Sequence, residues 1–573
     1  MRPATVARFM EDERSPNVPR SSVILFSCVL WCAPMLPAAA FGQARPDAGR
    51  LLEQVAPEPP APEQSKVPLQ VQERPAIKLP VGESIAVTRL NITGATRFPV
   101  EQLHAAIASE AEGKTLSLAQ LQGVAQLLTN YYRERGYLLT RAYLPAQQIE
   151  GGVVEIAILE GRLSQVRIEN EGAVKGPALA PLRSLPTDEP LSTSELEHAL
   201  LLAADLPGVD IRSTLTPGAS VGTSDLLVDV TGGRRFTGAL SADTYGNRAT
   251  GAARAGANVS FNNPLNVGDR LSVDAMASAE DLYHVRAGYQ LPITPWGTRM
   301  GVSYAWLDYA LGDEFEALDA DGTAKVASLH LQQPFIRSRG FNLAGELQYD
   351  DKDLEDRLGA FDVASDKRLH NWTLGLSGDF RDSAGRGANA FGVHYTRGRL
   401  DLDPLSRVLD AFTARSGGHF GKWNLGYQRL QSFTPAFSLY FSYEGQLANG
   451  NLDSAEKMSL GGAYGVRAYP QGEAAADEAQ LFSLEARLRL PLQLLGDWQL
   501  TSFIDHGQAR LSKDPWSVAD NHRELTGAGV GLNLSSASSW SLKASVAWRL
   551  GDERATSDSD KSPRGWLHAA TYF

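Results

Sequence analysis

The sequence predicts a transmembrane β-barrel of about 16 antiparallel strands, preceded by two small α+β modules. Three observations support this fold class. The chain begins with a segment that has the features of an export signal. Residues 83–233 then show one order of strands and helices twice. Residues 234–573 alternate between apolar and polar side chains with a period of two.

The predicted export signal covers residues 1–42. Arg2, Arg8 and Arg20 precede an apolar run at 23–33, and the small residues at 38–40 fit a cleavage site. The alternative is a membrane-anchoring helix, for which this apolar run is short. The signal therefore directs the chain out of the cytoplasm.

The composition removes several classes of function. Both cysteines, Cys28 and Cys32, lie inside the export signal, so the exported chain would have no disulfide, catalytic thiolate or cysteine-bound metal. A net charge of -12 and a pI of about 5.4 provide no general basic surface for nucleic acid. Beyond the signal, no run approaches the roughly 18 apolar residues of a spanning helix.

Residues 43–82 are predicted to contain a short helix followed by a proline-rich linker. The helix would run from Asp47 to Val55, with Leu51, Leu52 and Val55 on one side. Prolines recur from residue 57 to residue 80, and proline both fixes φ and removes a backbone donor. The linker is therefore expected to be extended or disordered.

The first α+β module is predicted at residues 83–161. A strand at 85–92 precedes one helix at 100–110 and a second that starts near Ser117 and ends at Gly136. Strands at 138–144 and 153–159 complete a β-α-α-β-β order.

The second module, at residues 162–233, repeats this pattern. Its strand at 163–169 is followed by a capping box, Ser192 to Glu195, that starts an amphipathic helix. Two strands, at 211–215 and 226–230, close the unit. The alternative is one irregular α+β domain over both modules.

Residues 234–573 carry the barrel signal. On the predicted strand at 484–490, leucines and alanine alternate with Glu485, Arg487 and Arg489, and other runs of about ten residues repeat this pattern. A soluble sandwich also alternates, but here charged residues repeatedly face opposite to aromatic ones. A polar lumen inside a lipid-facing barrel explains this distribution, and the barrel must close because lipid cannot satisfy a free sheet edge.

One loop and one strand of this region stand out. The loop at 461–470 is rich in glycine and places Arg467 between apolar and aromatic residues. A strand-like run at 503–507 carries a single carboxylate, Asp505. We expect Arg467 and Asp505 to meet inside the barrel. The alternative is an ordinary surface turn and a solvated strand aspartate.

Motifs for catalysis or metal binding are missing from the sequence. It contains no H-E-x-x-H motif and no P-loop, and its ten histidines have no metal-ligand spacing. The acidic cluster at 350–356 could bind calcium or form a solvated loop. We therefore predict no enzyme activity, no cofactor and no metal.

The order of segments resembles the TpsB transporters of two-partner secretion, the haemolysin secretion/activation family ShlB/FhaC/HecB. The resemblance covers the whole exported chain, and the two modules look like the POTRA domains of that family. The runs that carry it are residues 132–137, 142–147, 159–161, 201–209, 222–226, 243–248 and 263–269.

This resemblance implies a lumen loop whose tip carries a V-R-G-[YF] motif and contacts an F-x-D-x-G strand motif. The corresponding residues here are Val466, Arg467, Ala468 and Tyr469 in the loop, and Phe503, Asp505 and Gly507 in the strand. Ala468 replaces the usual glycine, so the tip would be strained if that position needed a positive φ.

The resemblance also implies location and partners. The barrel would lie in the lipid of the outer membrane, with the POTRA domains in the periplasm receiving an unfolded TpsA-like exoprotein. The terminal Phe573 looks like a signal for the barrel assembly machinery, and the helix near residues 44–56 resembles the plug helix of relatives. The client could be a haemolysin, an adhesin or a contact-inhibition toxin. The alternative function is a factor that inserts other barrels into the outer membrane.

Overall fold

The computed structural model describes residues 45–55, 69–71, 84–187, 189–382, 386–492, 494–536 and 539–573. The predicted export signal at 1–42 and most of the predicted linker lie outside the described residues. None of the helices in these ranges is long and apolar enough to cross a membrane.

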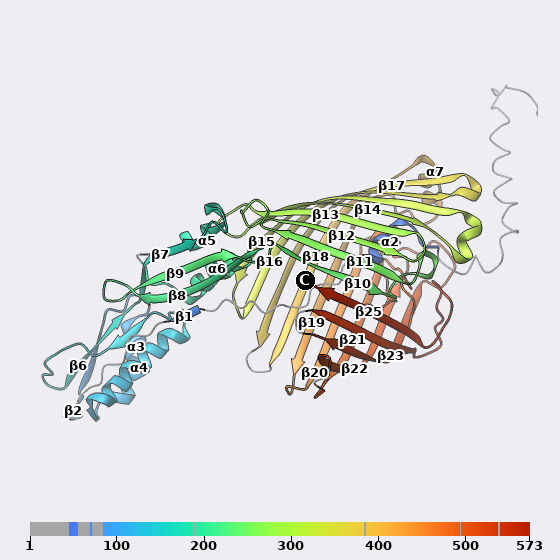
Figure 1. The fold of residues 1–573 in the computed structure, drawn as a ribbon. Coiled ribbons are helices and arrows are strands. Elements are labelled where there is room, and N and C mark those ends of the chain that lie inside the picture. The colour runs from blue at the N-terminus through green and yellow to red at the C-terminus, as the bar shows by residue number, and fades with distance from the viewer. Residues whose placement is uncertain are drawn as a thin grey trace, which may run out of the picture. The chain divides into compact units, whose positions relative to one another are not determined.

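The C-terminal part of the chain forms a closed antiparallel barrel of sixteen strands, from β10 (Phe236–Asp243) to β25 (Arg564–Tyr572), in the described residues (Figure 1). Each strand pairs with its neighbours in sequence, and β10 closes the circle by pairing with β25. The predicted fold class is therefore confirmed. The other strands are β11 (Arg254–Asn262), β12 (Arg270–Ser278), β13 (Leu282–Pro292), β14 (Arg299–Ala310), β15 (Ala320–Arg337), β16 (Phe341–Leu358), β17 (Val363–Asp382), β18 (Gly387–Leu402), β19 (Gly418–Ser432), β20 (Phe437–Ala448), β21 (Glu478–Leu490), β22 (Asp497–Arg510), β23 (His522–Ser535) and β24 (Trp540–Arg549).

The two faces of the barrel wall follow the period of two. On β22, Ile504 is 45% exposed on the outer face, whereas its neighbours Phe503 and Asp505 are buried on the inner face. Phe503, Asp505 and Gly507 thus share the lumen face. Because lipid solvates only apolar groups, the polar residues within the apolar belt of the wall turn inward.

Connections between strands alternate between the two rims. Those that follow even-numbered strands lie at the rim away from the start of β10, here called the far rim. They contain the short helices η4 (Arg248–Thr250), η5 (Asp313–Leu318), η6 (Gly359–Phe361), α7 (Pro404–Phe412) and η7 (Ser454–Glu456).

The first α+β module places two helices against a sheet of order β3-β6-β5. The predicted strand at 85–92 is split, because the backbone of Val87 bonds to Lys114 and Gly113 while Thr88 turns to Gly152. The predicted strand at 138–144 pairs only over its last part. The elements are β2 (Ser84–Ala86), β3 (Arg89–Thr93), α3 (Val100–Ala111), β4 (Thr115–Ser117), α4 (Leu118–Glu134), β5 (Arg141–Tyr143) and β6 (Val153–Leu159).

The second α+β module contains a sheet of order β1-β8-β9-β7. Its helix α6 starts with the predicted capping box of Ser192 and Glu195. Strand β1 (Leu69–Val71) comes from the predicted linker and pairs in parallel with β8. Three residues are too short for a periodic signal, so the sequence did not predict this strand. The other elements are β7 (Arg162–Asn170), η3 (Gly176–Leu179), α5 (Ala180–Arg183), α6 (Thr193–Ala204), β8 (Val209–Pro217) and β9 (Thr223–Gly232).

Candidate functional site

The connection between β20 and β21, residues 449–477, folds back into the barrel and is called the lumen loop below. Near its start, Glu456 accepts hydrogen bonds from Lys352 on β16 (2.6 Å) and Asn371 on β17 (2.7 Å), and pairs with Lys422 on β19 (2.9 Å). Its tip contacts β22. Since β16 and β22 lie on widely separated parts of the wall, the lumen loop crosses the interior.

The tip of the lumen loop is held by Arg467 and Asp505. Arg467 donates from Nε to Asp505 Oδ2 (2.9 Å) and from Nη2 to Oδ1 (2.8 Å), and its backbone N–H donates to Oδ2 (3.1 Å). Ser483 on β21 donates to Oδ1 (2.8 Å), and Glu485 Oε2 lies 3.6 Å from Arg467 Nη1. Asp505 is fully buried. This two-pronged, charge-assisted geometry is the strong form of such a pair.

The other two residues of the strand motif shape the site around this pair. The Cζ atom of Arg467 lies 3.3 Å from the ring centroid of Phe503, so the guanidinium stacks on an aromatic face. At Gly507, a Cβ atom would come within 3.0 Å of Leu460 and 3.2 Å of Val466. Phe503 therefore stacks against the guanidinium, and Asp505 binds it. Gly507 has no side chain and so leaves room for the loop to pack.

The neighbours of Arg467 in the loop are also buried. Val466 and Tyr469 are fully buried, and the Tyr469 hydroxyl donates to the Glu553 carbonyl (3.0 Å). Ala468 does not have a positive φ, whereas Ala474 does, at 53°. The backbone strain considered for Ala468 is therefore absent. The methyl group of Ala468 packs against Gly527, and a Cβ atom on Gly527 would lie only 2.5 Å from it.

The energetics of the pair follow from its burial. A surface ion pair contributes little because water screens it. Removing one partner of a buried pair costs roughly 3–5 kcal/mol, since the other charge stays buried and uncompensated. The Arg467 side chain is 15% exposed and Asp505 fully buried, so the loop tip has a well-defined docked state.

A second anchor of the lumen loop was not predicted. Glu473 is fully buried and accepts from Arg523 Nη2 on β23 (2.9 Å). It also accepts from the backbone and hydroxyl groups of Thr556 and Ser557 in the β24–β25 connection, at 2.6–3.0 Å. A carboxylate followed by three alanines in a loop is the only sequence signal for it, and its partners are remote in the chain.

The helix α2 (Ala48–Gln54) lies in the lumen against this loop, and Figure 1 shows it within the barrel. Its first N–H, from Ala48, donates to Asp356 on β16 (2.8 Å), and Glu53 accepts from the backbone (2.9 Å) and hydroxyl (2.8 Å) of Ser459 in the loop. A Cβ at Gly49 would come 2.6 Å from the Ala455 nitrogen. The helix and the loop therefore fit together without space between them.

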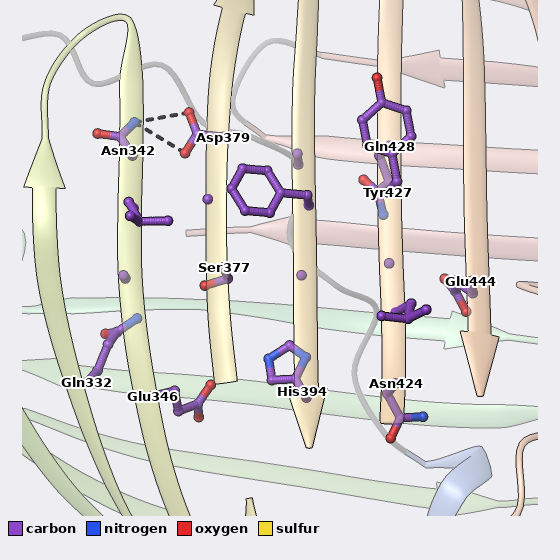
Figure 2. A pocket seen from close by; sticks show the side chains of 18 of the residues that line it. Gln332, Asn342, Glu346, Ser377, Asp379, His394, Asn424, Tyr427, Gln428 and Glu444 are labelled. Carbon is purple, nitrogen blue, oxygen red and sulfur yellow. Dashed lines mark hydrogen bonds between the residues drawn. The ribbon is translucent and has the colours of Figure 1, made fainter. Parts of the chain in front are cut away.

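A cavity of about 1220 Å³ occupies the lumen between α2 and the end of α6. Apolar and polar side chains both line it, and Figure 2 labels the polar residues Gln332, Asn342, Glu346, Ser377, Asp379, His394, Asn424, Tyr427, Gln428 and Glu444. Leu52 and Glu53 of α2 border it, as do Leu202 and Asp205 at the end of α6. Its polar side chains provide hydrogen-bonding partners for backbone groups that enter the cavity.

The end of α6 is fastened to the barrel wall. Asp205 accepts from Arg337 Nε (2.7 Å) and Nη2 (2.9 Å), and its carbonyl accepts from Arg299 Nη2 (2.8 Å). The second α+β module therefore meets the barrel next to the cavity.

Phe573 lies at the closure of the barrel. Its backbone N–H donates to Gly238 (3.1 Å), and its carbonyl accepts from the N–H of Gly238 (3.0 Å). A Cβ at Gly238 would lie 2.7 Å from its ring. The C-terminal residue thus completes the β10–β25 pairing.

A barrel filled by its own loop and helix, with modules that lead into it, defines a gated membrane pore. Residues 222–534 match the family model "Haemolysin secretion/activation protein ShlB/FhaC/HecB", and residues 85–161 match the ShlB-type POTRA domain. The chain belongs to this haemolysin secretion/activation family.

Individual relatives agree with this assignment. The heme/hemopexin transporter protein HuxB of Haemophilus influenzae is 30% identical over 97% of this chain and 99% of its own. The outer membrane transporter CdiB of Dickeya dadantii is 24% identical over 76% of this chain and 77% of its own. The solved structure of CdiB from Escherichia coli matches in fold, with a TM-score of 0.69, 22% identity, and coverage of 97% of this chain and 98% of that one.

These findings define the class of function. The chain is an outer-membrane transporter of two-partner secretion with periplasmic POTRA domains, and the family assignment favours this function over insertion of other barrels. The far rim of the barrel is consequently the extracellular rim. Transporters of this class act together with an exoprotein.

Proposed function

We propose that this transporter exports one large exoprotein, and that the lumen loop and α2 must leave their observed positions for it to pass. The main support for this proposal is the buried contact between Arg467 and Asp505, which fixes the loop across the lumen. The client enters extended from the periplasm. Since it folds only outside, its folding supplies the driving force.

The client would be received by exposed strand edges of the POTRA domains. A partner strand can extend a sheet by backbone hydrogen bonds, with little demand on sequence. In the second domain, β1 already occupies part of one edge, because Leu69, Gln70 and Val71 pair with Ser213, Thr214 and Leu215 of β8. A client strand at this edge replaces β1, which follows the plug helix α2 in the chain. Client recognition and release of the plug are then coupled.

The other partners of the transporter are lipid, the barrel assembly machinery and the client. The outer face contacts outer-membrane lipid, as its exposed apolar residues require. The C-terminal strand with Phe573 directs the chain to the barrel assembly machinery. The client is a haemolysin, an adhesin or a contact-inhibition toxin. The name of HuxB adds a protein concerned with heme or hemopexin to this set.

The test compares the proteomes of culture supernatant and outer membrane with and without the gene. We expect one very large protein to disappear from the supernatant or cell surface while other barrels keep their amounts. Depletion of many unrelated barrels would instead show a barrel assembly factor and contradict the proposal.

A further inference from the structure

The helix α7, in the extracellular connection between β18 and β19, has an apolar face that no described part of the chain covers. Its side chains recur with the helical spacing of one stripe. They are Leu405 (52% exposed), Val408 (56%), Leu409 (58%) and Phe412 (82%). Four large apolar side chains in contact with water on one helix face mark an interaction surface.

The opposite side of α7 is firmly attached. Asp403 caps the helix by accepting from the N–H groups of Leu405 (2.9 Å) and Ser406 (3.1 Å), and it also accepts from the N–H of Asp366 on β17 (3.2 Å). At the other end, Asp410 accepts from the N–H groups of Ser416 (2.8 Å) and Gly417 (2.9 Å). These contacts fix the orientation of the helix, so its apolar stripe is held away from the barrel wall.

The lipid cannot cover this stripe. The aromatic pair Tyr395 and Trp423, with ring centroids 4.8 Å apart, ends the apolar belt on β18, because the next outward residues, Arg397, Arg399 and Asp401, are charged. On tilted strands that rise about 3.3 Å per residue, the start of α7 stands roughly 20 Å beyond Tyr395. Acyl chains end well below it.

The helix borders the exit of the pore. Asn451, at the start of the lumen loop, donates from Nδ2 to the Ala414 carbonyl just after α7 (2.6 Å) and to the Asp514 carbonyl (2.9 Å). The end of α7 is therefore joined to the loop that closes the lumen. A polypeptide that emerges beside this loop meets α7 at once.

We propose that α7 is a docking surface for the exoprotein as it emerges, still unfolded, at the cell surface. This inference rests on the proposed function. An emerging chain exposes apolar side chains that it buries only on folding, and an uncharged apolar stripe accepts such segments regardless of their exact sequence. Transient contact there would oppose backsliding and would keep the segment from aggregating.

The experiment uses full-length transporter in cells that secrete its exoprotein, with a photo-crosslinking residue at Phe412 or, as a control, at Val518. Val518 is fully exposed on the β22–β23 connection, which contacts Asn451 through Asp514, so this control lies near the same exit but outside the apolar stripe. We expect exoprotein adducts at Phe412 during secretion and at least several-fold fewer at Val518. Adducts to a second transporter or to lipid alone, or equal adducts at both positions, would overturn the proposal.

A second measurement replaces the stripe with serine in one variant, Leu405→Ser, Val408→Ser, Leu409→Ser and Phe412→Ser, beside a Val518→Ser control. Loss of this apolar contact weakens binding roughly tenfold, and surface appearance of the exoprotein should slow accordingly, with unchanged barrel insertion. Unchanged secretion by the serine variant would contradict a role for α7. If the unaltered transporter secreted no protein, the proposed function itself would fail instead.

Discussion

At the scale of single residues, two of the carboxylates that hold the lumen loop differ in the number of their donors. Asp505 accepts from one guanidinium, one hydroxyl and one backbone N–H, whereas Glu473 accepts from one guanidinium, two hydroxyls and two backbone N–H groups. Both carboxylates are fully buried. Each therefore contributes to the docked state only while its partners stay in place, which suits a loop with two discrete positions.

Glu473→Gln should loosen the loop without displacing Arg467. The amide keeps the shape of the side chain, but it loses the charge that makes the bonds to Arg523, Thr556 and Ser557 strong, at a cost of about 1.5–3 kcal/mol. We expect more frequent openings in planar-bilayer current recordings. Glu478→Gln, which alters a partly exposed pair with Lys513 at the rim, is the matched control. Equal opening frequencies in both variants would show that Glu473 does not hold the loop.

In the first POTRA domain, Glu160 plays a comparable structural part. It accepts from the N–H groups of Thr96 (2.8 Å) and Arg97 (2.9 Å) and from the Tyr132 hydroxyl (2.8 Å). Burial alone would raise the pKa of Glu160, but the hydrogen bonds from Thr96, Arg97 and Tyr132 outweigh it and hold that pKa below its ordinary value. Its ionised form therefore stabilises the domain above the ordinary glutamate pKa, and this contribution is lost as the pH falls through the lowered pKa.

Hydrogen exchange of the full chain tests this linkage. Amide protection in α4 and β3 should fall as the pH drops from about 5 toward 3. The Glu160→Gln variant should be less protected at pH 7 and should lose most of this acid dependence. Identical pH profiles for the variant and the unaltered protein would exclude Glu160 as the responsible group.

At the scale of elements, the sequence did not predict short elements or contacts between residues that are far apart in the chain. The period of two in residues 234–573 was sufficient for the barrel, and the capping box located α6. Strand β1 is three residues long and is defined only by its partner β8, so no local pattern could reveal it. The Arg467–Asp505 contact could be anticipated from motifs, whereas the partners of Glu473 lie 50 to 84 residues away in the chain.

A disulfide between β1 and β8 tests whether the client replaces β1. Gln70 and Thr214 are register partners, and a variant with Gln70→Cys and Thr214→Cys places a cysteine at each. Because the predicted exported chain has no cysteine, no other thiol competes. We expect the oxidised variant to secrete poorly and a reducing agent to restore secretion, while each single variant secretes normally. Normal secretion by the oxidised form would place the client at another edge.

At the scale of the whole molecule, one chain combines periplasmic POTRA domains, a helix in the lumen and a closed barrel. The second POTRA domain is joined to the wall through Asp205 and Arg337, helix α2 contacts the lumen loop through Glu53 and Ser459, and the loop contacts the wall through Arg467 and Asp505. The cavity separates the first of these contacts from the other two, since the end of α6 and α2 both line it. Helix α2 and the loop tip are thus positioned independently of the contact between Asp205 and Arg337.

The measurement that tests this account most directly is the amount of exoprotein released by the Arg467→Ala transporter, normalised to the barrel inserted in the outer membrane. Arg467→Lys serves as a graded comparison, since lysine keeps the charge but cannot form the two-pronged contact. Loss of the arginine removes roughly 3–5 kcal/mol from the docked state of the loop. Because transport needs the loop to alternate between a docked and a displaced position, a loop that cannot return to its docked position should support little release. We expect release to fall strongly with alanine and partly with lysine, at unchanged barrel amounts. Normal release by the alanine variant would contradict the role of the lumen loop.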